Sequence, residues 1–431
     1  MMARYSFASV QAGLSRDSRP GRPHATILLW AAHDGLHMSV PDPTHERAPL
    51  PASVHADKPV RRSPRRKLAI SCVTLVVASA LAWIGSAIVR SLEDYGRLKS
   101  GRGWVGRIHQ SDQELGHTTV AGARGGEVFP VGPEVPVWID AQGFRIPENA
   151  LDDRPRVRPV VLALGCSFTF GAACRAEDTF AWKVGERLGG SSLNAGVCSH
   201  GVAQMTILAR RMIAKERPDI VLVQYSPWLI ARSRYTLAPT YIGLLPTPRY
   251  VLDPEGEVQL APPEFESLVF DLPIAEHARS ESGLLDATSF VLRVGLPLHL
   301  HDDVQLRRRA VRSWLGLRRK PASEAAVVRV AYAEIAQLCA RHGARAIVVA
   351  LDRDDAAVDS VPPNVLVELG FEIVQATNAL EARLDPRTGE NFARAYHHWR
   401  GDPPEVVDDH PNAAAHALVA EEILRVIEAR R

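Results

Sequence analysis

The hydrophobic pattern divides the chain into three parts. Residues 1–66 are rich in Pro, Arg, His, Ala and Ser and show no sustained period, which predicts a disordered tail. An uncharged apolar run from Leu68 to Val89 follows and predicts a transmembrane helix over 67–90, because such a helix needs roughly 20 apolar residues. Over 158–431, buried-strand and amphipathic-helix patterns alternate, which is typical of βαβ units around a parallel sheet.

The spacing of apolar residues predicts individual strands and helices in this α/β part. Fully apolar runs predict strands buried on both faces, at "RPVVLAL", "DIVLVQY" and "ARAIVVALD", with a shorter last strand at "FEIVQAT". Amphipathic patterns predict helices at "TFAWKVGERLGG", "QMTILARRMIAKER" and "EAAVVRVAYAEIAQLCARHG", and a final helix follows "DDHPN".

Two segments do not follow the alternation. Residues 91–157 contain short strand-like pieces such as "EVPVWID", and we predict a stalk and lead-in there. Residues 231–322 predict an insertion near the mouth of the site, with a hairpin around Pro254-Glu255-Gly256. The later part of the insertion mixes apolar and basic residues, a pattern shared by helices packed on a sheet and helices lying on lipid headgroups.

Charge near the apolar run predicts the topology. The cluster "RRSPRRK" precedes the run, so the positive-inside rule predicts a cytoplasmic N-terminus and an exported C-terminal domain. A cleaved signal peptide is the alternative, although the apolar run is long for one. The net charge is only +2 at pH 7 and no basic stripe with interleaved aromatic residues occurs, so nucleic acid is not a predicted partner.

A serine and a histidine at opposite ends of the α/β part are candidates for catalysis. Ser167 follows the first buried strand within "GCSFTFG", which carries it to the sheet edge where α/β proteins place ligands. His410 precedes the last helix, and Asp408 lies two residues before it. In a triad, Ser167 attacks an ester carbonyl, His410 acts as base and then acid, and the aspartate orients the imidazole. The alternative is a purely structural role, in which Ser167 belongs to a turn and the histidine and aspartate cap the last helix.

These residues carry a resemblance. "GCSFTFG" and "DDHPNAAAHALVA" resemble the first and last blocks of the SGNH/GDSL hydrolases, which are serine esterases and acyl transferases on a flavodoxin-like sheet. "LNAGVCSHGVAQM" and "RPDIVLVQYSPWL" are similar to the second block and to the strand leading into the third, and "VWIDAQGFRIP" resembles a segment of membrane-tethered members. The resemblance covers about 137–230 and 325–430. It implies a three-layer α/β fold, no cofactor, and Asp408 rather than Asp409 as the triad acid.

The sequence departs from the family at the oxyanion site. The family's glycine donor aligns with Ser199, whose backbone N–H can serve if this residue adopts the required φ and ψ. The third-block asparagine aligns with Trp228, and loss of one donor costs about 100- to 1,000-fold in kcat. The backbone N–H of Ser167 is the expected remaining donor, with Gln204 and Ser226 as further candidates.

The resemblance implies an ester-linked acyl group, such as acetyl, on an envelope glycan or lipid as the substrate. Tyr225 and Trp228 are predicted to stack on a sugar ring, and Gln204 completes the predicted substrate-binding set. The alternative function is a non-catalytic glycan-binding protein that assists a partner acyltransferase, because Trp228 replaces a catalytic asparagine.

Cysteine and histidine spacing does not predict a metal site. The chain has no CxxC pair. Cys166 and Cys198 fall in segments that should converge, which leaves two alternatives, a disulfide in an oxidising compartment or two separate core thiols. The histidines nearest the predicted site also lack metal-ligand spacing: His397, His398, His410 and His416.

Overall fold

The computed structural model describes residues 64–100, 103–150, 155–239, 244–274, 283–351 and 364–430. The predicted disordered tail therefore lies outside the described residues except for its last positions.

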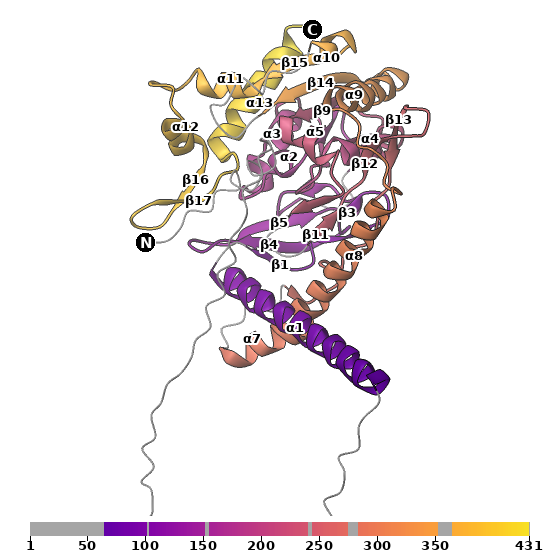
Figure 1. Ribbon diagram of the computed structural model, residues 1–431. Helices are drawn as coiled ribbons and strands as arrows, with labels where there is room; N and C mark the ends of the chain where they lie inside the picture. Colours follow the sequence, from indigo (N-terminus) through magenta and orange to yellow (C-terminus); the bar gives the residue numbers. More distant parts are fainter. Residues whose placement is uncertain are drawn as a thin grey trace, which may run out of the picture. The chain divides into compact units, whose positions relative to one another are not determined.

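A nine-stranded sheet forms the centre of the α/β part (Figure 1). Five neighbouring strands are parallel, in the chain order 2-1-3-4-5, which is the flavodoxin-like order. In this order the chain reverses its direction of winding between the first and third strands, and ligands of such sheets bind at that point. In spatial order the five strands are β8 (Ser191–Asn194), β7 (Val160–Leu164), β9 (Ile220–Tyr225), β14 (Arg345–Ala350) and β15 (Glu372–Gln375).

Helices cover both faces of the sheet, so the predicted three-layer α/β fold is confirmed. Every residue of β7 and β9 is buried, because helices lie above and below these strands. One face carries α3 (Phe180–Arg187), α11 (Ala376–Glu381), α12 (Gly389–Tyr396) and α13 (Ala413–Glu428). The other carries α4 (Val202–Glu216), α5 (Pro227–Arg232), α9 (Glu324–Arg341) and α10 (Val365–Glu368).

Side-chain caps fix where the main helices begin. Thr179 accepts a hydrogen bond from the backbone N–H of Trp182 at the start of α3, and Ser323 does the same for α9. Asn412 accepts from the N–H of Ala415 at the start of α13. Each cap satisfies a backbone donor that the helix itself cannot pair, which typically contributes about 1 kcal/mol.

The lead-in is part of the sheet, which corrects the predicted stalk over 91–157. Four antiparallel strands extend the parallel part beyond β8. The strand around Trp138 alternates buried and half-buried positions, so its inner face needs a covering layer and packs into the protein core. The elements are β1 (Gly103–Val105), β4 (Arg124–Val128), β5 (Val135–Ile139) and β6 (Arg145–Ile146), with a separate hairpin of β2 (His109–Asp112) and β3 (Gly116–Thr119).

The predicted hairpin in the insertion is confirmed. Strands β12 (Arg249–Leu252) and β13 (Val258–Ala261) are antiparallel, and the carboxylate of Asp253 accepts the backbone N–H groups of Glu255 and Glu257 in the turn. A second ribbon pairs β10 (Leu237–Pro239) with β11 (Leu244–Pro246). A long bent helix follows, made of α7 (Leu284–Phe290), the π-helical segment η4 (Val291–Gly295) and α8 (Leu296–Trp314).

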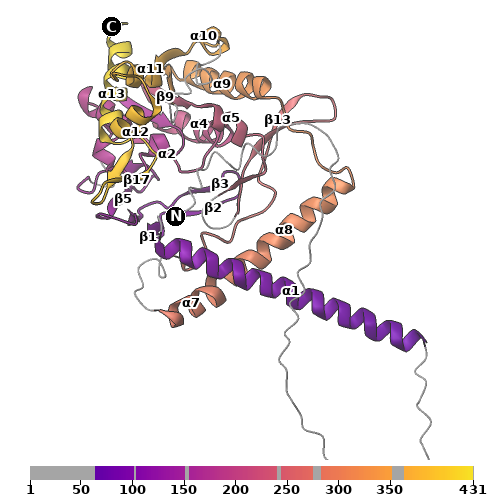
Figure 2. The same ribbon diagram turned by 60° about the vertical axis from the view of Figure 1, so that its left-hand side comes forward.

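The apolar run forms helix α1 (Pro64–Ser100), which is long and apolar enough to cross a membrane. Side chains in its first half are exposed, among them Leu68, Val73 and Leu75. Its second half packs on α7, η4 and α8, and α8 crosses it in both views (Figures 1 and 2).

Four short elements complete the described chain. They are α2 (Ser167–Phe170), the 3-10 turn η3 (Ala176–Asp178), and the antiparallel ribbon of β16 (His398–Arg400) and β17 (Glu405–Asp408).

Candidate active site

Ser167, His410 and Asp408 form a continuous chain of hydrogen bonds. The Ser167 Oγ lies 2.8 Å from His410 Nε2, and His410 Nδ1 lies 2.8 Å from Asp408 Oδ1. The same carboxylate oxygen accepts the backbone N–H of His410 at 2.8 Å. All three residues are less than a tenth exposed. The arrangement allows the imidazole to take the serine proton while the carboxylate stabilises the imidazolium that forms.

The serine is held by the turn between β7 and α2. Ser167 is the first residue of α2, and the strand before it is fully buried. A Cβ at Gly165 would lie 2.0 Å from the hydroxyl oxygen of Thr169, so only glycine fits beside this turn. The turn therefore places Ser167 at the carboxyl edge of the sheet, at the reversal point between β7 and β9.

Gln224 of β9 ties the serine turn to the neighbouring strand. Its Oε1 accepts the backbone N–H of Cys166 at 3.1 Å and the hydroxyl of Thr169 at 2.9 Å. Its Nε2 donates to the Oγ of Ser226 at 2.9 Å, and Ser226 donates to the carbonyl of Leu351. This buried network connects the carboxyl ends of β7, β9 and β14, so the position of Ser167 is fixed relative to three strands.

The histidine and the aspartate come from the last ribbon and the start of α13. Asp408 ends β17 opposite His398, and Asn412 caps α13 two residues after His410. The side-chain amide of Asn412 also donates to the carbonyls of Ala395 and His397, at 2.9 and 3.0 Å. The His410 backbone is therefore held on both sides.

The two aspartates differ in burial. The Asp408 side chain is 3% exposed and lies in hydrogen-bond contact with His410, whereas Asp409 is 48% exposed with its oxygen 3.7 Å from Nδ1. The inner carboxylate is thus Asp408, the one that the resemblance implies.

Burial favours the neutral form of three groups near the triad, His398, His416 and Cys174. Burial lowers the pKa of His398, and burial lowers the pKa of His416 to about 3. The Nδ1 of His416 accepts the backbone N–H of Phe180, so this ring has a structural role. Burial also raises the pKa of the Cys174 thiol to about 12, which makes it a poor nucleophile.

Ser199 meets the backbone requirement of the oxyanion position. Its φ is +66°, in the left-handed region that glycine usually occupies. The preceding loop is fixed by a hydrogen bond from the Val197 N–H to the Gly165 carbonyl, and by another from the ring of His117 to the Cys198 carbonyl. The N–H of Ser167 belongs to the first turn of α2, where no intrahelical acceptor exists. Ser199 and Ser167 remain the candidate donors.

Trp228 lies beside the triad. Its ring packs edge to face on Phe168 with centroids 5.2 Å apart, and Phe168 packs in the same way on His410 at 5.2 Å. Trp228 is half-buried in the first turn of α5, so it is available at the site edge.

The remaining predicted site residues lie in the core, which corrects their predicted roles in substrate binding (Tyr225, Gln204) and at the oxyanion site (Gln204, Ser226). Tyr225 is 6% exposed near Tyr332, so its ring has no free face for a sugar. Gln204 is 1% exposed, accepts the N–H of Gly201 and donates to the carbonyl of Leu115, and thereby caps α4. Ser226 is equally buried within the Gln224 network. Strand β9 is buried on both faces along its whole length, so Tyr225 has no ligand-facing side there.

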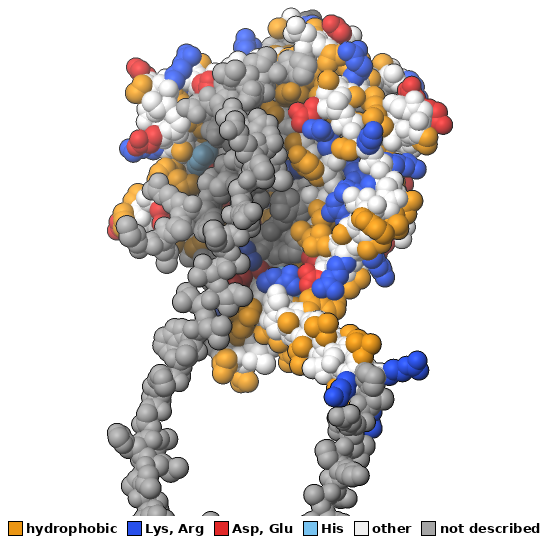
Figure 3. All heavy atoms as spheres, in the orientation of Figure 1, with side chains coloured by type: hydrophobic (Ala, Val, Ile, Leu, Met, Phe, Trp, Pro, Cys, Tyr) orange, Lys and Arg blue, Asp and Glu red, His pale blue; other side chains and the backbone are white. Residues whose placement is uncertain are grey.

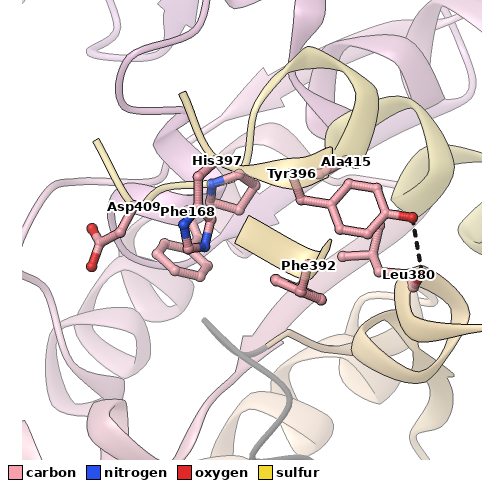
Figure 4. Close-up of a pocket in the computed structure, with 8 residues that line it drawn as sticks. Phe168, Leu380, Phe392, Tyr396, His397, Asp409 and Ala415 are labelled. Atoms are coloured by element: carbon pink, nitrogen blue, oxygen red, sulfur yellow. Dashed lines mark hydrogen bonds between the residues drawn. The ribbon is translucent and has the colours of Figure 1, made fainter. Parts of the chain in front are cut away.

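A small pocket adjoins the triad (Figure 4). Phe168, next to Ser167, forms one wall, and Asp409 and Pro411 flank His410. The remaining lining is mostly apolar, and the Tyr396 hydroxyl is occupied by the carbonyl of Leu380 at 2.9 Å. The lining residues are Phe168, Leu380, Phe392, Tyr396, His397, Asp409, Pro411 and Ala415.

Two residues of the site were missed by sequence reasoning. Gln224 is the single amide in an otherwise apolar strand, and that interruption was the available signal. Arg145, from the segment "GFR", is 1% exposed and donates to the carbonyls of Phe170 and Gly171 at 2.6 Å each. Its guanidinium therefore holds the end of the serine helix α2.

The acidic and thiol groups near the triad bear on the metal and disulfide alternatives. Asp408, Asp409 and His410 have ligand atoms within 4.8 Å of one another, and the ring nitrogens of His410 are hydrogen-bonded to Asp408 and Ser167. Cys166 and Cys198 are not joined by a disulfide, so of the two alternatives the structure has separate thiols.

Comparisons with known proteins retrieve solved structures at low similarity. No family model matches the sequence, and no curated protein matches it. One similar structure is LAE5, an alpha/beta hydrolase enzyme from the metagenome of Lake Arreo, with 11% identity and a TM-score of 0.34, covering 64% of this chain and 97% of that one. Another is a putative lipolytic protein of the G-D-S-L family from Desulfitobacterium hafniense, with 10% identity and a TM-score of 0.31, covering 62% and 99%. A third is a carbohydrate esterase family 2 enzyme of Corynascus, with 12% identity and a TM-score of 0.32, covering 77% and 91%.

At TM-scores near 0.3 and identities near 10%, these similarities carry no argument about the activity of this chain.

Proposed function

We propose that this protein is an SGNH-type serine esterase or acyl transferase. The observation that carries the proposal is the contact of Ser167 Oγ with His410 Nε2 at 2.8 Å, continued to Asp408. The serine oxygen would form a bond to the ester carbonyl carbon and pass its proton to His410. His410 then protonates the departing alcohol, and water or an acceptor alcohol releases the acyl group from Ser167.

The proposed substrate is an ester-linked acyl group, such as acetyl, on an envelope glycan or lipid. Trp228 supports a sugar ring as one part of it, because the indole lies half-buried at the site edge and aromatic faces stack on apolar sugar faces. The basic cluster before α1 supports a cytoplasmic N-terminus and an exported catalytic domain. Reporter fusions after residue 100 and before residue 64 test this topology.

A second candidate is a non-catalytic glycan-binding protein that assists a partner acyltransferase. The observation in its favour is Trp228 at the position of the family's third-block asparagine, where it packs on Phe168 and supplies no carboxamide. This candidate predicts glycan binding without turnover.

Labelling of the full-length protein with a fluorophosphonate probe separates the two. The esterase proposal expects labelling that disappears in Ser167→Ala and persists in Ser313→Ala, a matched change at an exposed serine. Absence of labelling in a correctly folded wild-type protein would reject an activated serine and favour the binding function.

A further inference from the structure

We propose that residues 306–320, the outer half of α8 and the turn after it, lie in the anionic headgroup layer of the bilayer that α1 crosses. This inference rests on α1 being a membrane span and does not depend on catalysis. It gives the catalytic domain a second attachment to the membrane.

The segment exposes large apolar side chains. Trp314 is 84% exposed, Leu317 61% and Val311 54%. Side chains earlier in the same long helix, such as Phe290 and Leu298, are fully buried in a small core cluster. The inner part of the helix therefore packs on the protein, whereas its outer part has an apolar surface that no described residue covers. Figure 3 shows hydrophobic and basic side chains next to one another over this helix.

The charge of the segment fits an anionic surface. Residues 304–320 contain no Asp or Glu. Arg309 and Arg318 turn inward and donate to the hydroxyl of Thr236 at 2.6 and 3.2 Å. The other cations are exposed, and their long apolar stems allow the charged groups to reach lipid phosphates while the stems cover apolar surface. They are Arg307, Arg308, Arg312, Arg319 and Lys320.

Contacts with α1 set the height of the segment relative to the bilayer. The carboxylate of Asp303 accepts from the indole of Trp83 at 2.5 Å and from Arg90 at 2.7 Å. The guanidinium of Arg307 lies 4.5 Å from the Trp83 ring centroid. Trp83 belongs to the uncharged run that predicts the membrane span. Residues 303–307 are therefore level with the outer end of that run, where Trp side chains prefer the membrane interface.

The direction of α8 keeps the segment in the interface. Both views show α8 crossing α1, so the two helices diverge beyond the crossing (Figures 1 and 2). A helix that leaves a membrane span sideways at interface height lies along the membrane surface, with its apolar side chains in the boundary between headgroups and acyl chains.

The test uses full-length protein in lipid nanodiscs of phosphatidylcholine alone or mixed with phosphatidylglycerol. We expect hydrogen exchange over 306–320 to be slowed at least about tenfold by phosphatidylglycerol, because each cation near an anionic surface adds attraction. Brominated acyl chains should quench part of the tryptophan fluorescence of the wild type. The Trp314→Phe variant should lose this quenched part.

The triple variant Arg308→Gln, Arg312→Gln and Arg319→Gln should lose the dependence on phosphatidylglycerol. The matched control changes three exposed arginines on α3 and α9, Arg187, Arg329 and Arg341, to Gln and should retain it. Equal exchange in both lipids, or no quenching of Trp314, would overturn the proposal. Protection that arises only in discs with two protein copies would also overturn it and would assign the surface to dimer formation.

Discussion

Ser167 and His410 are 243 positions apart in the chain, yet their Oγ and Nε2 atoms lie 2.8 Å apart. One residue follows the first parallel strand and the other precedes the last helix, so the contact forms only when α13 has packed on the sheet. Reactivity of Ser167 toward an active-site probe therefore reports that α13 has packed on the sheet. The two aspartates beside His410 provide the sharpest test of this arrangement.

Asp408→Asn should lower kcat for an activated ester by about 10³- to 10⁴-fold, because the carboxylate that fixes the imidazole tautomer is lost. Asp409→Asn should change kcat by less than about threefold, since its half-exposed carboxylate interacts with His410 through solvent-screened charge. Hydrolysis of p-nitrophenyl acetate by both variants gives the comparison. Equal losses in the two variants would contradict the assignment of Asp408.

Trp228→Asn should raise kcat, by up to about 100-fold, because a carboxamide at this position adds a donor to the oxyanion site. Trp228→Phe is the control, since it keeps an aromatic ring on Phe168 and adds no donor. Burst-phase kinetics with the same ester would separate acylation from deacylation. A fall in kcat for the asparagine variant would indicate that Trp228 itself contributes to catalysis.

The Gln224 network should stabilise both the fold and the serine turn. Gln224→Leu leaves the Cys166 N–H and the Thr169 hydroxyl without their acceptor, and each buried unpaired group costs about 1–3 kcal/mol. We expect a lower unfolding midpoint in urea and a lower kcat in the remaining folded protein. Gln113→Leu, at an exposed position, is the control and should leave both unchanged. Equal midpoints in the two variants would show that water replaces the amide.

Buried histidines should make the fold sensitive to acid. Burial lowers the pKa of His109 to about 3 and that of His117 to about 4, both from an ordinary value of 6.5. Because protonation is easier in the unfolded chain, the stability from these neutral rings is full above pH 6.5 and is lost as the pH falls toward 4.

Thermal unfolding of the full-length protein at stepwise lower pH measures this loss. His117→Gln should flatten the dependence, since an amide can still donate to the Cys198 carbonyl and does not titrate. An unfolding midpoint that stays constant between pH 7 and 4 would contradict the effect.

Much of the fold and the triad could be predicted, because both depend on signals that are local in sequence. The apolar runs of β7 and β9 specify strands buried on both faces, and "GCSFTFG" places Ser167 at the end of one of them. The lead-in was misjudged since β6 has only the residues Arg145–Ile146 and shows no period; its place is fixed by pairing with β8.

The sequence could not show which side chains line the site and which support it from below. That depends on which face of each helix or strand packs on its neighbours. Gln204 and Tyr225 are polar or aromatic residues in the segments that resemble the family, but both are covered by packing against other elements. Gln224 accepts the backbone N–H of Cys166, and Arg145 donates to the backbone carbonyl of Phe170. Backbone groups are the same at every position, so the sequence does not show which of them a side chain will bind.

The connection between helix α1 and the sheet is short, which limits how far the site can lie from α1. Helix α1 ends at Ser100 and β1 begins at Gly103, and the few peptide links between them extend by about 10 Å at most. A domain joined by so short a linker cannot move far from the end of α1. On the proposal that α1 spans a bilayer, the short link would keep Ser167 near that bilayer and would favour esters presented at its surface.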